Sequence, residues 1–151
     1  NQSDAYLFVD GDDIISPTKV SRCVKKWLED VEAIGIVYSN QLVENQVERY
    51  EAPMYIQPFS RKLLESYDYI EPNYLITKKA LYLAGQFEEQ ILFPDYDMQL
   101  RASEKVVFVH IPEILSTHRI TPYGMTVKTK DADRKRSYEA TIKRALARRE
   151  A

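Results

Sequence analysis

The sequence predicts an α/β domain, and three neighbouring segments near its beginning support this prediction. Residues Ala5–Val9 form a continuous apolar run, which is typical of a strand that is buried on both faces. An amphipathic segment follows Ser16 and Pro17, and a second short apolar run covers Ala33–Tyr38. A strand, a helix and a strand in this order favour parallel pairing through a right-handed crossover.

Composition and charge narrow the class of protein. Of the 151 residues, 44% are hydrophobic and 29% are charged, as in ordinary globular domains with a real core. No apolar run approaches the length of a membrane span, and the chain shows no signal-peptide pattern. The single cysteine, Cys23, excludes an internal disulfide and a cysteine-based zinc site. We therefore expect a reducing, cytoplasmic setting.

The net charge of −2 is unevenly distributed along the chain. Residues 128–151 carry nine basic and four acidic side chains, a net charge of +5, which leaves −7 on residues 1–127. An acidic body repels a nucleic-acid backbone, so a nucleic-acid partner is not expected. We divide the chain accordingly into a body, 1–127, and a basic C-terminal helix, 128–151. Docking of this helix on the body is favoured over a peripheral membrane contact, because its apolar stripe is short.

The first apolar run leads directly into Asp10, Gly11, Asp12 and Asp13. Open α/β sheets bind ligands at the carboxyl ends of their strands. Two carboxylates 4 Å apart repel each other by about 1 kcal/mol in water and by about 4 kcal/mol near a protein surface. Mg²⁺ or Mn²⁺ would remove this repulsion. The alternative is a solvated turn whose carboxylates accept backbone hydrogen bonds.

Local signals place further elements along the chain. Ser16 and Pro17 predict a helix start, and one stripe of the helix is expected to face the sheet with the residues Val20, Cys23, Val24, Trp27 and Leu28. A meander or an edge hairpin is predicted over Gln41–Glu51, and a short helix over Phe59–Tyr67. Thr77 is expected to cap a helix that reaches Leu83 and ends at Gly85. Tyr67, Tyr69 and Tyr74 suit either sugar stacking or ordinary packing, and packing is favoured.

Proline and charged residues indicate a helix over the segment Phe93–Arg101. Pro94 suits a first helical turn, and Asp97 and Arg101 have the spacing of a surface ion pair, whereas Asp95 has no obvious partner. Strands are predicted over Lys105–Ile111 and Glu113–Ile120, joined at Pro112. They carry His110 and His118, for which packing is favoured over metal ligation. A docked helix is predicted over Asp131–Ala151.

Taken together, the segments from Ala5 to about Val127 resemble the second half of a family 2 glycosyltransferase of the GT-A fold. Four stretches carry the resemblance: Asp10–Asp13 followed by Pro17, Gly85–Glu89, Pro94–Arg101 and His118–Thr121. The resemblance implies a mixed sheet flanked by helices, without the preceding βαβ nucleotide-binding half of such enzymes. That half is expected in the same or in another chain, and without it we expect weak donor binding and no activity.

The resemblance also implies roles for individual residues. Asp10 and Asp12 would hold Mg²⁺ or Mn²⁺ against the diphosphate of a nucleoside-diphosphate sugar, with Asp12 favoured as the direct ligand, and the ion would stabilise the leaving diphosphate. Asp95 would be the general base toward a glycan or lipid-linked acceptor in an inverting reaction, in surface polysaccharide synthesis. Arg119 would contact phosphate. Pro94 and Thr121 replace a glutamate and a metal-binding histidine of the family, so His118 is the candidate third ligand, provided that the local register differs.

Two other functions are kept as alternatives. Haloacid-dehalogenase-like phosphatases also begin with an apolar strand and Asp-x-Asp, but their motif continues with Gly-Thr, where this chain has Asp13 and Ile14. The second alternative is a non-catalytic domain that binds a glycan or a partner protein. Nothing in the sequence defines the donor sugar, the acceptor or the linkage.

Overall fold

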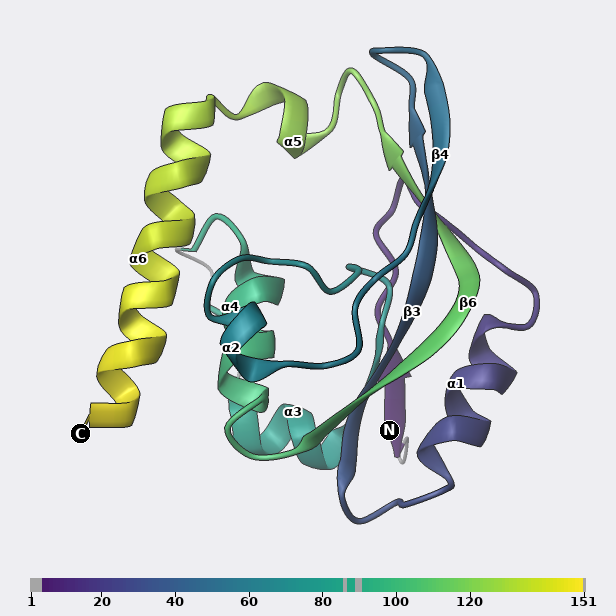
Figure 1. The fold of residues 1–151 in the computed structure, drawn as a ribbon, viewed down its shortest axis with the longest axis vertical. Helices are drawn as coiled ribbons and strands as arrows, with labels where there is room; N and C mark the ends of the chain where they lie inside the picture. Colours follow the sequence, from purple (N-terminus) through teal and green to yellow (C-terminus); the bar gives the residue numbers. More distant parts are fainter. Residues whose placement is uncertain (1–3, 86, 89–90, 151) are drawn as a thin grey trace.

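A computed structural model of the chain describes residues 4–85, 87–88 and 91–150, and these form a mixed α/β fold around one sheet (Figure 1). The strands are β1 (Ala5–Leu7), β2 (Ile14–Ile15), β3 (Ile34–Asn45), β4 (Tyr50–Met54), β5 (Leu75–Thr77) and β6 (Val107–Ile120). The helices are α1 (Lys19–Trp27), α2 (Arg61–Leu64), α3 (Lys78–Ala84), α4 (Pro94–Ala102), α5 (Met125–Lys128) and α6 (Asp131–Glu150). The predicted α/β class, a mixed sheet flanked by helices, is confirmed.

The sheet has the strand order β1-β5-β3-β6-β2, and β4 pairs with β3 outside this path. Parallel pairing joins β3 to β6, whereas the other pairs are antiparallel. In Figure 1, α1 lies on one face of the sheet. The opposite face is covered by α2, α3 and α4, with α6 beyond them.

The first strand differs from its prediction in burial and in pairing. Its three residues are only half-buried, because β1 lies at the edge of the sheet, and Val9 beyond it is exposed. The predicted strand buried on both faces is therefore wrong. So is the predicted direct pairing with the strand of Ala33–Tyr38, because β5 lies between β1 and β3 and is antiparallel to both. The two strands thus run in the same direction without being neighbours.

The predicted break at Pro112 is also wrong, because β6 is one continuous strand. The register against β3 moves from Ser39 opposite Ile111 to Asn40 opposite Ile114, so the segment that contains Pro112 forms a bulge. Such an irregularity lets a residue without an amide hydrogen sit inside a paired strand. The predicted hairpin of Gln41–Glu51 is confirmed as the antiparallel pair of β3 and β4.

Helix α1 begins later than predicted and turns a different stripe to the sheet. Its N-cap is Thr18, without a side-chain cap, so the predicted start at Ser16 and Pro17 is wrong. Cys23 is fully buried as expected, and Trp27 packs against the same small core cluster. Val20 and Leu28 are 50% and 60% exposed, because the buried position of the first turn belongs to Lys19.

Three other helix signals are confirmed. The Thr77 side chain accepts a hydrogen bond from the amide of Ala80 at 3.1 Å. Gly85 ends α3 with φ = 84°, a conformation that favours glycine. Pro94 is the first residue of α4.

The predicted ion pair of Asp97 and Arg101 exists, with 2.8 Å between Oδ2 of Asp97 and Nε of Arg101. Asp97 is buried, so the prediction that this pair lies on the surface is wrong.

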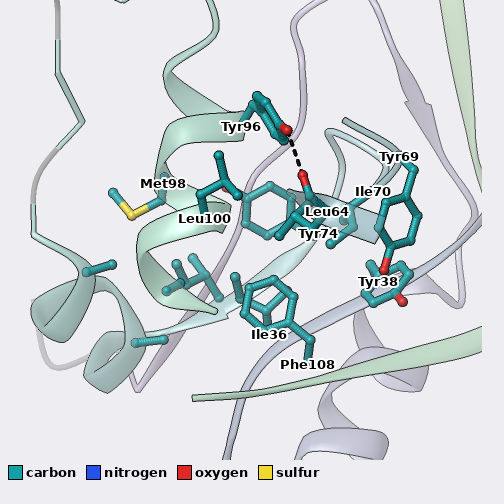
Figure 2. Close-up of a cluster of buried hydrophobic side chains, with 14 of the residues drawn as sticks. Ile36, Tyr38, Leu64, Tyr69, Ile70, Tyr74, Tyr96, Met98, Leu100 and Phe108 are labelled. Carbon is teal, nitrogen blue, oxygen red and sulfur yellow. Dashed lines mark hydrogen bonds between the residues drawn. The ribbon is translucent and has the colours of Figure 1, made fainter. Parts of the chain in front are cut away.

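The main core lies between the sheet and the helices of the opposite face (Figure 2). It includes Tyr69 and Tyr74, which confirms packing for these two, whereas Tyr67 is exposed. Helix α6 docks on this core through the buried Ala145, although Leu146 of the predicted stripe is exposed. Among the described helices, none has both the length and the apolar character of a transmembrane segment.

Candidate functional site

The acidic turn after β1 is held in place by the side chain of Asp13. The amide of Asp13 donates to the carbonyl of Asp10 at 3.0 Å, which closes the turn. The Asp13 carboxylate is fully buried and accepts hydrogen bonds from the Asn73 side chain at 2.7 Å and from the Arg119 amide at 2.8 Å. The Arg119 guanidinium donates to the Asp12 carbonyl. Asp13 thus accepts a backbone hydrogen bond, as the alternative interpretation of this turn expects for its carboxylates.

Asp13 and His118 form an ion pair within this arrangement. The Nδ1 atom of His118 lies 3.1 and 3.2 Å from the two oxygens of the Asp13 carboxylate. Burial by itself would raise the pKa of Asp13, but the hydrogen bonds from His118, Arg119 and Asn73 outweigh it and lower the pKa. The hydrogen bond with Asp13 is also the main reason why the pKa of His118 is raised, against the effect of burial.

Three of the residues proposed from the sequence line one cavity of about 690 Å³, within the range of small-molecule sites. They are Asp10, Asp95 and His118, which come from the acidic turn, from α4 and from β6. The complete lining is Phe8, Val9, Asp10, Gln41, Val43, Met54, Asp68, Tyr69, Ile70, Pro72, Tyr74, Phe87, Phe93, Pro94, Asp95, His118, Ile120, Met125 and Tyr138. Asp12 and Arg119 are not among the lining residues, and they are joined by the hydrogen bond from the Arg119 guanidinium to the Asp12 carbonyl.

Asp95 is the second residue of α4, so its carboxylate lies at the positive end of the helix dipole. Burial raises the pKa of Asp95, although the backbone amides of Tyr96 and of Asp95 itself donate to the carboxylate and offset part of the rise. Burial also raises the pKa of Asp10, and the negative charges of Asp13, Asp95 and Asp12 add to this effect. The charge of Asp95 thus contributes to the raised pKa of Asp10.

The acidic turn offers two carboxylates, those of Asp10 and Asp12, that could ligate a divalent ion. Within the described ranges, no group of three or more His, Cys, Asp or Glu side chains is arranged to hold a metal. Nδ1 of His118 is occupied by Asp13, so only its second ring nitrogen is left for a ligand. Asp10 and Asp12 remain as carboxylate donors. Mg²⁺ characteristically takes one or two protein carboxylates and completes its shell with water and substrate phosphate.

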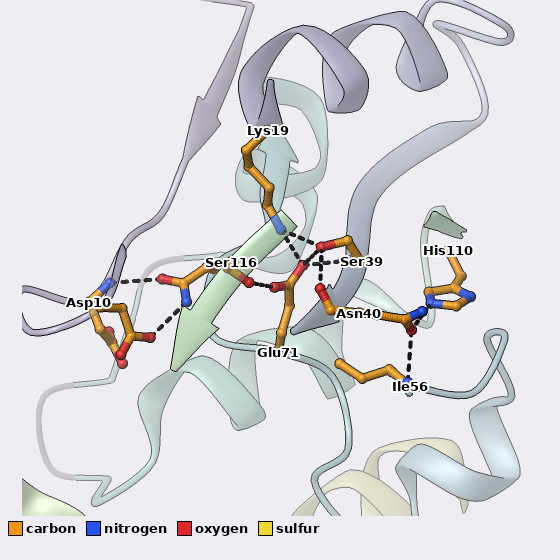
Figure 3. A network of polar contacts seen from close by, with 10 residues as sticks. Asp10, Lys19, Ser39, Asn40, Ile56, Glu71, His110 and Ser116 are labelled. Atoms are coloured by element: carbon orange, nitrogen blue, oxygen red, sulfur yellow. Dashed lines mark hydrogen bonds and ion pairs between the residues drawn. The ribbon is translucent and has the colours of Figure 1, made fainter. Parts of the chain in front are cut away.

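Two buried or cavity-lining acids were not predicted from the sequence, one at the cavity and one in the support of α1. Asp68 lines the cavity, between α2 and β5. Glu71 is buried and forms an ion pair with Lys19, and it also accepts hydrogen bonds from Ser39 and Ser116 (Figure 3). The sequence contained one signal for the buried Glu71. Lys19 lies one turn before Cys23 on the buried stripe of α1, and a buried ammonium group needs an acidic partner.

The stretch Gly85–Glu89, which contributed to the resemblance, is only partly described. Gln86 and Glu89 lie outside the described residues. Phe87 lines the cavity and contacts Phe8 edge to face, with ring centroids 5.3 Å apart.

Comparison with known proteins gives one distant similarity. No protein-family model matches the chain. The chain is 29% identical over 132 residues to chondroitin synthase of Pasteurella multocida (strain Pm70). The aligned region covers 86% of this chain but 14% of that protein, so the chain spans a small part of the length of this relative. The chain is therefore distantly similar to a glycosyltransferase.

Proposed function

We propose that this chain is the metal-binding and acceptor-binding half of an inverting family 2 glycosyltransferase with the GT-A fold. Its donor would be a nucleoside-diphosphate sugar and its acceptor a glycan or a lipid-linked glycan, in surface polysaccharide synthesis. The observation that carries the proposal is the cavity that brings Asp10 and Asp95 together from distant parts of the chain. The distant similarity to chondroitin synthase agrees with it.

Asp95 is the group in this proposal that moves a proton. Its carboxylate takes the proton of the acceptor hydroxyl while the hydroxyl oxygen attacks the anomeric carbon of the donor. The bond between that carbon and the diphosphate oxygen breaks, the diphosphate leaves, and the configuration at the carbon inverts. A raised pKa makes Asp95 a stronger base, and a positioned general base contributes roughly 10²–10⁴-fold to the rate.

Asp10 and Asp12 would hold Mg²⁺ or Mn²⁺, and His118 could add a ligand only through the ring nitrogen that Asp13 leaves open. The bound ion supplies charge stabilisation to the leaving diphosphate. Arg119, fixed by its bonds to Asp12 and Asp13, adds positive charge beside the turn.

The proposal includes a nucleotide-binding half beside β1. In the described part of the chain, β1 pairs with β5 alone, so one edge of the strand keeps unpaired backbone groups. Such an edge readily accepts a further strand. A nucleotide-binding half paired there would lie next to the acidic turn, which directly follows β1.

The metal site is tested by calorimetric titration of the chain with Mn²⁺ and a nucleoside diphosphate together. We expect Asp10→Asn and Asp12→Asn each to weaken the binding of the Mn²⁺-nucleotide complex by at least about tenfold, the equivalent of 1.4 kcal/mol. Glu48→Gln is the matched control, because this acid is exposed in the turn between β3 and β4. Equal binding by all four proteins would refute the metal assignment.

The catalytic assignment is tested in the protein that includes the nucleotide-binding half. Asp95→Asn should remove sugar transfer and leave donor binding unchanged, because an amide cannot take the proton. Normal transfer by this variant would end the assignment of Asp95 as the base. Phosphate release from p-nitrophenyl phosphate would instead favour the phosphatase. Glycan binding without transfer would favour the non-catalytic domain.

A further inference from the structure

Three buried polar atoms of residues that line the cavity lack hydrogen-bond partners in the described part of the chain. They are Oε1 of Gln41, Oδ1 of Asp68 and the hydroxyl of Tyr74. Asp68 and Tyr74 belong to the part of the cavity beside Asp95. Tyr74 is 0% exposed. Buried polar groups are nearly always paired, and an unpaired one costs about 1–3 kcal/mol. A fully buried hydroxyl beside a buried carboxylate therefore points to a ligand that brings its own hydrogen-bonding groups.

The charge of the cavity restricts the nature of this ligand. Asp10, Asp68 and Asp95 line it, and its described lining contains no lysine or arginine. His118 is the cationic side chain of the lining, and it faces the Asp13 carboxylate. A further negative charge placed between Asp68 and Asp95 would meet like charges in a partly desolvated setting, where the repulsion is several times stronger than in water. The part of the cavity between Asp68 and Asp95 therefore disfavours an anionic ligand group.

The aromatic side chains of the lining restrict the ligand further. The rings of Phe93 and Tyr138 stack with centroids 4.3 Å apart, and Phe8 meets Tyr74 edge to face at 5.6 Å. These rings pack on one another and give the cavity a largely apolar lining. An apolar lining combined with hydrogen-bonding groups suits a ring that has apolar C–H faces and polar edges. A pyranose has this character.

The protonation of the acidic pair agrees with a ligand rich in hydroxyl groups. Burial raises the pKa of Asp68 well above its ordinary value, and the charge of Asp95 raises it further. A carboxyl with a raised pKa takes up a proton more readily than an exposed one. A hydroxyl group is a suitable partner in both states, because it also donates and accepts.

We propose that Asp68 and Tyr74 bind hydroxyl groups of the terminal acceptor sugar, and that this subsite takes a neutral or amino sugar and rejects one that carries a carboxylate. This inference rests on the proposed function, because it assigns the acceptor to the cavity of Asp95. It places Asp68 as a specificity-determining residue and leaves proton transfer to Asp95.

The test is sugar binding by the chain, without donor or metal, followed in amide NMR spectra. The probes are methyl β-D-glucopyranoside, the corresponding 2-amino glycoside and methyl β-D-glucuronide. We expect the neutral and amino sugars to bind at least about tenfold more tightly than the glucuronide, a difference of 1.4 kcal/mol. Equal binding of the three sugars, tighter binding of the glucuronide, or no binding by any of them would overturn the proposal.

Two variants separate recognition from a purely structural role. Asp68→Asn should weaken binding of the neutral sugar by about tenfold and reduce the discrimination against the glucuronide, because one negative charge is removed. Tyr74→Phe should weaken binding of the neutral sugar by about three- to tenfold. Tyr55→Phe serves as its control, because Tyr55 is exposed. Unchanged affinity and unchanged discrimination in both variants would contradict the assignment. If Asp68→Asn does not fold, the proposal is decided by the sugar affinity of Tyr74→Phe and by the preference of the original chain for the neutral sugar over the glucuronide.

The outcome is independent of the test of the donor site. Loss of sugar discrimination together with intact Mn²⁺-nucleotide binding would reject the acceptor subsite and leave the proposed function in place. Failure of Mn²⁺-nucleotide binding in the protein that includes the nucleotide-binding half would instead reject the proposed function, whatever the sugars show.

Discussion

At the scale of single residues, Asp13 and His118 couple the shape of the acidic turn to pH. Asp13 is 0% exposed at its side chain and holds His118, Asn73 and Arg119 at once. The pair is weakened at both ends of the pH range, because the pKa of Asp13 is lowered and that of His118 is raised. The Asp13 contribution to stability is present above its ordinary pKa of 3.8 and is lost as the pH falls through the lowered value.

For His118 the sign is reversed, and this gives a testable prediction. Its stabilising contribution is full below the ordinary pKa of 6.5 and is lost as the pH rises through the raised value. We expect the free energy of unfolding of the original chain to fall by about 1–2 kcal/mol across this rise. In His118→Gln this fall should disappear.

The measurement is urea unfolding between pH 5.5 and 9 in the presence of a chelator. His110 stays in place in both proteins, and burial lowers its pKa, so its effect on stability is common to both profiles and cancels in their comparison. Parallel stability profiles for His118→Gln and the original chain would show that the pair with Asp13 contributes nothing.

At the scale of elements, the ion pair of Lys19 and Glu71 fixes α1 on the sheet. Both side chains are 0% exposed. Lys19 also donates to Ser39 of β3 at 2.8 Å, and Ser116 of β6 donates to Glu71. Burial raises the pKa of Glu71, and Lys19 offsets part of that rise. The ionised pair is thus expensive to desolvate and depends on the presence of both partners.

This dependence predicts a strong coupling in a double-mutant cycle. Lys19→Met and Glu71→Gln should each destabilise the chain by about 3–5 kcal/mol, because each leaves a buried polar partner without its counter-charge. The double variant should be more stable than the sum of the two losses allows. Urea unfolding at pH 7 measures all four proteins.

The exposed pair of Lys26 and Glu29, on the last turn of α1 and just beyond it, provides the control. Glu29→Gln should lower the free energy of unfolding by less than about 1 kcal/mol, as is usual for exposed pairs. Additive losses at Lys19 and Glu71 would mean that the two side chains do not stabilise each other.

The elements also show which features can be predicted from sequence. Signals that act within one turn correctly predicted the helix ends at Thr77, Gly85 and Pro94, because the capping residue and its partner are close in sequence. The local signal of Ser16 and Pro17 was the exception. Features that depend on distant partners were not. The three residues of β5 are too few to show a period, yet they separate β1 from β3. The bulge at Pro112 exists only because β3 continues beside it.

The candidate site shows the same division. Asp10 and Asp95 were proposed from their local motifs, and the fold places both at one cavity. Asp68 was missed because its neighbours are tyrosines whose packing dominates the local pattern. Its position beside Asp95 follows from the packing of the segment between α2 and β5, which no spacing rule predicts.

At the scale of the whole molecule, the cavity exists only in the complete fold. Its walls come from the turn after β1, from the segment before β5, from α4, from β6 and from Tyr138 of α6. Helix α6 therefore closes one side of the site as well as covering the core. Seven of the nine basic residues of 128–151 lie on the same helix, whereas the cavity is acidic.

The last prediction concerns the recognition of the nucleotide by the molecule as a whole. The proposed donor contacts, Asp10, Asp12 and Arg119, address the metal and the phosphates, and base recognition is assigned to a nucleotide-binding half on the free edge of β1. The 151-residue chain should therefore bind the Mn²⁺ complexes of UDP, GDP and pyrophosphate with affinities within about threefold of one another, a difference below 0.7 kcal/mol. Calorimetric competition measures these affinities. Addition of a nucleotide-binding half should create a base preference and should protect the amides of Ala5–Leu7 from hydrogen exchange, because paired backbone groups exchange slowly. A strong base preference in the 151-residue chain by itself would show that recognition of the nucleotide is already complete there, and that β1 needs no partner for it.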